Sequence, residues 1–75
     1  MIIDIKNSDG TLKKISVVLD EIKQELIEKC GEEIANRIIE RGGFKHAASV
    51  YDLNPIVEQL NSGMACEKLG EFYLY

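Results

Sequence analysis

Cys30, Cys66 and His46 are the side chains of the 75-residue sequence best suited to bind a soft metal ion. A structural zinc site needs four such ligands, which usually arrive in pairs separated by only a few residues. The two cysteines lie far apart in the chain, and His46 is its single histidine. We therefore predict no metal site, and we expect Cys30 to be a small apolar side chain in the core.

His46, Ser49 and Asp52 follow one another at intervals of one helical turn, which could align a base, a nucleophile and an orienting carboxylate. Many surface helices give the same pattern, and a working site would also need donors for an oxyanion. The pair Gly42-Gly43 lacks the Lys-Ser/Thr that follows in a phosphate-binding loop. We therefore expect Lys45 and His46 to be solvated, and we predict neither catalysis nor a cofactor.

The C-terminal residues are better candidates for binding a partner. Three of the five aromatic residues lie in the last four positions, and acidic residues precede them. An apolar end of this kind is a liability unless it is buried in the fold or against another protein. We predict that Tyr73, Tyr75, Glu67 and Glu71 contact a partner protein with a basic surface, because acidic side chains steer association toward basic ones.

The charge of the chain disfavours a nucleic-acid partner. The formal net charge is −4, from 9 basic and 13 acidic residues. From Gly42 onward the only bases are Lys45 and Lys68. Nucleic-acid affinity depends on Lys and Arg side chains that replace the counterions of several phosphates, and the sequence holds no such cluster.

Residues 38–60 nevertheless resemble a helix-turn-helix, a motif in which the second of two helices enters the major groove of DNA. The turn would be residues 52–54, and the second helix would be residues 55–61. That helix has no Lys or Arg, and its spacing after Ala48 is about one residue short of the usual pattern. DNA binding is therefore an alternative that rests on resemblance to a motif and not to a protein family.

The longest periodic signal runs from Ile15 to Arg41, where apolar residues recur every three or four positions. We expect Ser16 to cap the first helix of this segment, because its hydroxyl can accept a hydrogen bond from a free backbone N–H. Leu19, Ile22 and Leu26 lie on the apolar side of that helix. We predict that all three are buried.

Gly31 is expected to divide this segment into two helices. Beyond it the apolar side turns to a new direction, so that a continuous helix would bury Glu33 and Arg37. Burying those charges would cost far more than their exposed i,i+4 pairing supplies. We therefore predict helices near residues 17–30 and 32–41, with Gly31 as the terminating residue.

Shorter elements are expected on both sides of these helices. Residues 2–6 and 11–15 should pair as a β-hairpin around the turn residues 7–10, although a helix starting near Leu12 competes with this interpretation. Helices are expected at about 44–52 and again after Asn54-Pro55, where Asn can cap and Pro suits the first turn. That last helix should stop at residues 61–63.

The C-terminal residues 71–75 are expected to form a strand preceded by a break at Gly70. The apolar side chains alternate with period two, so Phe72 and Leu74 should be buried on one face. The burial would lie in the monomer or at a dimer interface. The predicted fold class is therefore α+β: an N-terminal β-hairpin, three to four short helices, and a C-terminal β-strand completing a small antiparallel sheet.

The size of the chain indicates one domain with a thin core and a stability of about 5 kcal/mol. Small domains gain stability from partner subunits, disulfides or metals; oligomerisation is the favoured source here, and a homodimer is one possible form. No apolar run is long enough for a membrane span. We expect a cytoplasmic protein with reduced thiols, and a disulfide is the alternative.

The function predicted from these observations is that of a small acidic protein-binding module, a regulator or stoichiometric inhibitor that acts through its surface and not as an enzyme. The helix-turn-helix DNA-binding protein is the alternative. A third possibility is an accessory subunit of an enzyme.

Overall fold

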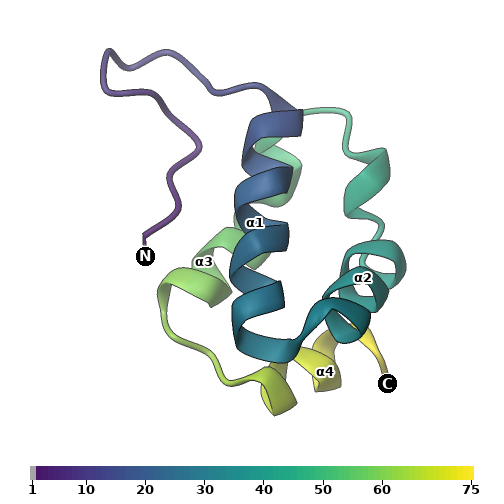
Figure 1. The fold of residues 1–75 in the computed structure, drawn as a ribbon. Coiled ribbons are helices and arrows are strands. Elements are labelled where there is room, and N and C mark those ends of the chain that lie inside the picture. Colours follow the sequence, from purple (N-terminus) through teal and green to yellow (C-terminus); the bar gives the residue numbers. More distant parts are fainter. Residues whose placement is uncertain (1) are drawn as a thin grey trace.

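The computed structural model describes residues 2–75, and within them the chain is helical, with no β-sheet (Figure 1). Four α-helices and two short 3-10 helices follow the N-terminal segment: α1 (Ile15–Cys30), α2 (Glu32–Arg41), η1 (Phe44–His46), η2 (Val50–Leu53), α3 (Asn54–Asn61) and α4 (Cys66–Tyr73). The predicted α+β class is therefore wrong. None of the helices described is long and apolar enough to cross a membrane.

The N-terminal segment forms the predicted turn but not the predicted hairpin. One antiparallel bridge joins Lys6 to Leu12, and the Lys13 N–H donates to the Ile5 carbonyl at 2.8 Å. The pairing ends there, because α1 already begins at Ile15. Upstream, the backbone of Ile3 bonds instead to the side chain of Asn61 in α3. The two arms therefore diverge after the turn, which is why no strand pair extends from residue 2 to residue 15.

Gly31 separates α1 from α2, as the change in direction of the apolar residues predicts. Its φ of +87° lies in the region that glycine adopts without strain, and its N–H bonds to the Ile27 carbonyl at 2.9 Å. The break lets α2 fold back beside α1 with Glu33 and Arg37 exposed. The predicted cap at Ser16 is wrong, since Lys14 holds the N-cap position and makes no side-chain cap bond.

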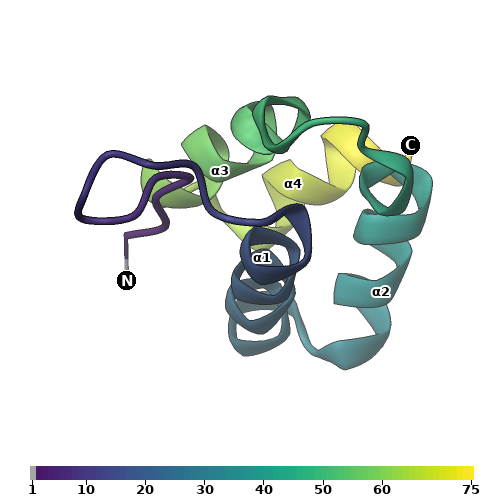
Figure 2. The same ribbon diagram turned by 90° about the horizontal axis from the view of Figure 1, so that it is seen from above.

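The core lies on one side of α1, with the other helices arranged around that side (Figure 2). Ile22 and Leu26 are buried as predicted, whereas Leu19 is only half-buried and Val18 is fully buried. At the start of α1, the side that faces the core is therefore centred on Val18 and not on Leu19. The largest fully buried side chains come from five of the six helical elements: Val18, Ile22, Leu26, Ile38, Leu53, Ile56 and Leu69.

Residues 44–52 do not form the single helix expected for them. A capping box divides the segment: the Asp52 carboxylate accepts hydrogen bonds from the N–H groups of Ala48 (3.0 Å) and Ser49 (3.2 Å). The Ser49 hydroxyl in turn accepts from the Tyr51 N–H at 3.2 Å. These bonds hold Ser49 in an extended conformation, so the chain makes η1 and η2 instead.

The start of α3 at Asn54 and its end at Asn61 agree with the predicted stop and restart signals. Pro55 lies in the first turn, where its missing N–H costs nothing. Asn54 itself is helical, with φ −54° and ψ −43°, and Leu53 takes the N-cap position without a side-chain cap. The expectation that Asn54 caps this helix is therefore wrong.

The predicted C-terminal strand is also wrong, because α4 continues through Gly70 to Tyr73. Leu69 is fully buried and Tyr73, one turn later, is half-buried, so helical spacing decides which side chains face the core. Phe72 is 56% exposed, which contradicts its predicted burial, and Leu74 is half-buried. The side chains of residues 71–75 therefore do not alternate between two faces, because these helical i,i+4 contacts decide which of them are buried.

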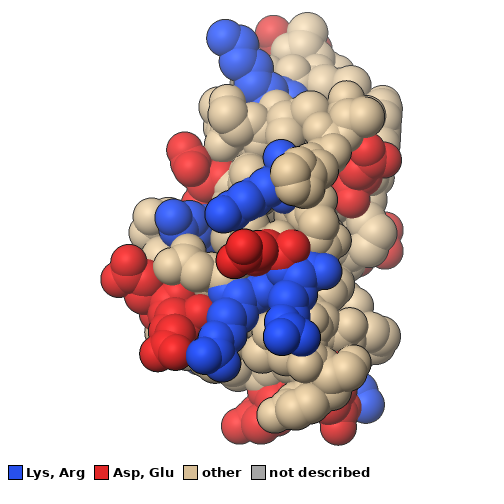
Figure 3. Space-filling model, turned by 90° about the vertical axis from the view of Figure 1, so that its right-hand side faces the viewer, with Lys and Arg blue, Asp and Glu red and all other residues tan. Residues whose placement is uncertain are grey.

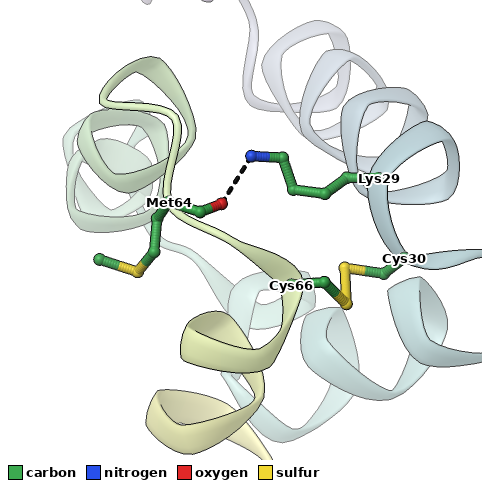
Figure 4. The surroundings of a disulfide bond; sticks show 4 residues. All are labelled: Lys29, Cys30, Met64 and Cys66. Atoms are coloured by element: carbon green, nitrogen blue, oxygen red, sulfur yellow. Dashed lines mark hydrogen bonds between the residues drawn. A yellow bond between two sulfur atoms is a disulfide. The ribbon is translucent and has the colours of Figure 1, made fainter.

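Cys30 and Cys66 form a disulfide, so the expectation of reduced thiols is wrong and the alternative holds (Figure 4). The bond joins the last residue of α1 to the first residue of α4, and the two Cα atoms are 5.6 Å apart. Beside it, the Lys29 ammonium donates to the Met64 carbonyl at 2.6 Å. The two contacts anchor the N-terminal end of α4 to the end of α1.

Candidate protein-docking groove

Two adjoining hollows lie between α2 and the C-terminal residues, and they share an apolar floor. That floor is formed by Ile34 of α2 and Leu74, and Tyr75 borders both hollows. Ile34 and Leu74 are half-buried, whereas the Tyr75 side chain is 99% exposed. We call the two hollows together the α2–α4 groove.

The first hollow has a volume of about 430 Å³ and a basic edge made by Arg37 and Arg41. These residues lie one turn apart on α2, so their guanidinium groups project from the same side of the helix. Arg37 pairs with Glu33 at 3.1 Å, in an exposed position where such a pair contributes little to stability. No acidic side chain of residues 2–75 lies within ion-pair distance of Arg41.

The second hollow has a volume of about 350 Å³ and an acidic edge made by Glu67 and Glu71 of α4. Cys66 and Gly70 complete this side. Both carboxylates are exposed, and Glu71 pairs with Lys68 at 3.2 Å. Glu67 also lies in the first turn of α4, where the helix dipole favours a negative charge.

The groove therefore carries opposite charges on its two sides, with apolar side chains between them. Figure 3 shows the face of the molecule that holds α2 and the C-terminal end. Basic side chains gather on this face beside acidic ones, and both border uncharged surface. Such a surface can hold an apolar side chain and orient it by charge on both sides.

The four predicted partner-contact residues do not all lie in this groove. Tyr75, Glu67 and Glu71 line it, but Tyr73 faces the other way. The Tyr73 ring packs edge-on against Phe44, with ring centroids 5.4 Å apart, and its hydroxyl donates to the Gln59 side-chain oxygen. Burial raises the pKa of Tyr73 above its usual value of 10.0. Tyr73 thus fixes α4 to the rest of the fold.

The groove also contains four residues that the sequence does not predict as partner contacts: Ile34, Arg37, Arg41 and Leu74. A signal was present, since Arg37 and Arg41 repeat at helical spacing on the exposed side of a helix that was correctly predicted. The residues that lie beside these arginines depend on the direction of α4, whereas the sequence predicts a break at Gly70 and a strand over residues 71–75.

Neither the catalytic pattern nor a metal site is assembled within residues 2–75. Asp52 caps η2 instead of orienting His46, and the Ser49 hydroxyl is occupied by the Tyr51 N–H. Lys45 and His46 are exposed, as expected for solvated side chains. No group of three or more metal-ligating side chains occurs in the described part of the chain.

The helix-turn-helix residues adopt a different arrangement from the one that the motif implies. Residues 44–46 and 50–53 form two separate 3-10 helices, and α3 turns Ile56, Val57 and Leu60 into the core. Pro55 and Glu58 are its exposed side chains. Neither side chain is a donor to a phosphate or to a base edge.

Comparison of the chain with protein-family models, curated proteins and solved structures finds no match. The assignment of the α2–α4 groove therefore depends on its own geometry and charge.

Proposed function

We propose that the protein is a small acidic protein-binding module, a regulator or stoichiometric inhibitor that docks its partner in the α2–α4 groove. One observation carries the proposal: an apolar floor lies between Arg37 and Arg41 on one side and Glu67 and Glu71 on the other. The fully exposed Tyr75 stands on that floor. Tyrosine and arginine are the residue types that most often dominate binding energy at protein interfaces.

The charge of the chain adds a preference for the partner. A net charge of −4 steers association toward basic surfaces, with an on-rate that falls as salt rises. Basic side chains of the partner would meet Glu67 and Glu71, and an apolar side chain would enter the floor of the groove. On the other side of the groove, Arg37 and Arg41 would favour a docked segment that carries an acidic group at the end that lies beside them.

The disulfide supports an oxidising compartment for this activity in place of the cytoplasm. Disulfides persist outside the cytoplasm, where glutathione and thioredoxin do not keep thiols reduced. Alkylation of free thiols in intact cells, followed by mass measurement of the protein, tests this. Protection of Cys30 and Cys66 supports an oxidising compartment, and alkylation of both supports the cytoplasm.

The docking proposal is tested by site-directed photocrosslinking in the native host. A photoreactive phenylalanine analogue replaces Tyr75 in one variant and Tyr51 in another. Tyr51 is a matched control, because it is 53% exposed and does not line the groove. We expect a discrete crosslinked protein from position 75 only, and its loss when Glu67→Arg and Glu71→Arg are added. Equal crosslinking from both positions would refute docking in the groove.

Two alternative functions are tested by a DNA titration and by the identity of the crosslinked partner. Titration of labelled duplex DNA at about 50 mM salt, where electrostatic binding is strong, tests the helix-turn-helix alternative. Micromolar binding that weakens steeply with salt would make DNA binding the leading function. A crosslinked partner that is an enzyme, and that needs this chain for activity, would identify an accessory subunit.

A further inference from the structure

The α2–α4 groove is self-complementary. Its two hollows share Ile34, Leu74 and Tyr75, and the basic and acidic edges lie on opposite sides of these shared residues. A two-fold axis that runs along the groove, between two copies that face each other, exchanges the two edges. Two copies related by such an axis therefore place the α2 arginines of each opposite the α4 glutamates of the other.

We propose that the occupant of the groove is a second copy of this chain, bound as a symmetric dimer. In this dimer Arg37 and Arg41 of each protomer pair with Glu67 and Glu71 of its partner. The inference rests on the groove of the proposed function, but it replaces the basic partner expected there with a second acidic copy, so the preference set by the net charge does not apply to it. Tyr75 of each protomer enters the apolar floor of the other, which explains why a large aromatic side chain is fully exposed in the single chain.

The charges available at the groove suit this pairing. Arg41 and Glu67 have no ion-pair partner within residues 2–75, and Arg37 and Glu71 make only exposed pairs on their own helices. Pairing across the interface therefore displaces contacts that contribute little. Arg and carboxylate groups form bidentate pairs, which fix the register of the two copies.

The net charge of −4 on each copy opposes association, but only at long range. The screening length is about 8 Å at physiological salt, so repulsion between distant charges is largely removed. At the groove edges, the attraction between the nearest opposite charges then outweighs the remaining long-range repulsion. The dimer should consequently weaken at low ionic strength, where the repulsion between the two acidic copies is least screened.

Charge reversal on each side of the groove tests the dimer without any need to identify another protein. One variant carries Arg37→Glu and Arg41→Glu, and the second carries Glu67→Arg and Glu71→Arg. In each variant alone, both edges of a symmetric dimer would hold like charges. In a mixture, every edge of the mixed dimer holds opposite charges again.

Matched controls carry the same change in net charge away from the groove. Lys6→Glu with Lys14→Glu matches the first variant, and Glu28→Arg with Glu58→Arg matches the second. These four side chains are exposed and do not line either hollow. Circular dichroism of all four proteins verifies that the fold is retained, and sedimentation equilibrium gives their masses.

We expect the wild type and both controls to dimerise at concentrations between about 10 µM and 1 mM. The dissociation constant of each groove variant should rise at least about tenfold, because like charges directly opposed at an interface cost several kcal/mol. An equimolar mixture of the two groove variants should recover a dimer that contains one chain of each.

Three results would overturn the second-copy inference: a wild type that stays monomeric to about 1 mM, groove variants that dimerise like their controls, or a mixture that remains monomeric. None of these three results would by itself refute the proposed docking function. A monomeric protein whose position 75 still crosslinks to another protein keeps the docking function and loses only the identity of the partner.

Discussion

Cys30 and Cys66 are bonded across 36 positions of sequence, and their disulfide joins the end of the longest helix to the start of the helix that forms the acidic side of the groove. The Lys29 ammonium reinforces the same junction through the Met64 carbonyl (Figure 4). Glu67 follows Cys66 directly, so the position of the acidic edge relative to α2 depends on this link.

Removal of the disulfide should therefore cost much of the stability of the domain. For a closed loop of about 36 residues, the chain-entropy model gives about 4 kcal/mol. We expect Cys30→Ala with Cys66→Ala to lower the free energy of unfolding by roughly that amount in urea melts.

Reduction of the wild type should give the same loss and should leave the double variant unchanged. Equal stability of the oxidised and reduced wild type would show that the link does not constrain the unfolded chain.

The core side of α1 gives a second prediction. Leu26 is fully buried, whereas Val17 on the same helix is 45% exposed. We expect Leu26→Ala to cost about 2–5 kcal/mol, because it removes apolar contacts and leaves a cavity. Val17→Ala should cost less than about 0.5 kcal/mol. Chemical denaturation measures both, and a loss below about 1 kcal/mol for Leu26→Ala would contradict its central place in the core.

The sequence predicts α1, α2 and the break between them, because the apolar pattern of a long periodic segment shows which of its sides faces the core. Gly31 is an example: the change in direction between Leu26 and Ile38 is local information, and the structure agrees with it. Residues 2–15 and 71–75 are short, and their local patterns suit strands. Their conformations are decided by distant contacts instead, namely the bond of Ile3 to Asn61 and the burial of Leu69 against the core.

The candidate site could be predicted only in part for the same reason. Glu67, Glu71 and Tyr75 were identified from composition, and they lie together in the groove. Tyr73 could not be separated from them, since a strand would place it on the same face as Tyr75. A helix places it a half-turn away, against Phe44.

The Asn61 side chain holds the N-terminal segment, which gives a third prediction. Its amide nitrogen donates to the Ile3 carbonyl, and its oxygen accepts from the Ile3 N–H, both at 2.8 Å. Ile3 is almost fully buried, so Asn61→Ala leaves its backbone without partners. We expect a loss of about 1–3 kcal/mol and faster hydrogen exchange at the Ile3 amide.

Ser62→Ala is the matched control for Asn61→Ala. The Ser62 hydroxyl bonds only to the nearby Gln59 carbonyl in an exposed turn. Its removal should leave exchange at Ile3 unchanged. Exchange at Ile3 that is equally fast in the wild type and in Asn61→Ala would show that the contact does not hold the segment.

The burial of Tyr73 should make the stability of the domain fall at alkaline pH. Burial favours the neutral phenol and raises the pKa of Tyr73 above its unfolded value of about 10. Below pH 10 the phenol is neutral in both states, and its stabilising effect is complete. As the pH rises toward and through the folded pKa, the unfolded state ionises first and the stabilisation is lost.

Tyr73→Phe isolates this effect, because all other titrating groups are common to both proteins. We expect the difference in unfolding free energy between the wild type and Tyr73→Phe to be constant from pH 7 to about 9.5 and to shift against the wild type above that. Urea melts across this range, in buffers free of thiols, measure the difference. Parallel stability curves up to about pH 11 would mean that the Tyr73 hydroxyl is as well solvated in the fold as in the unfolded chain.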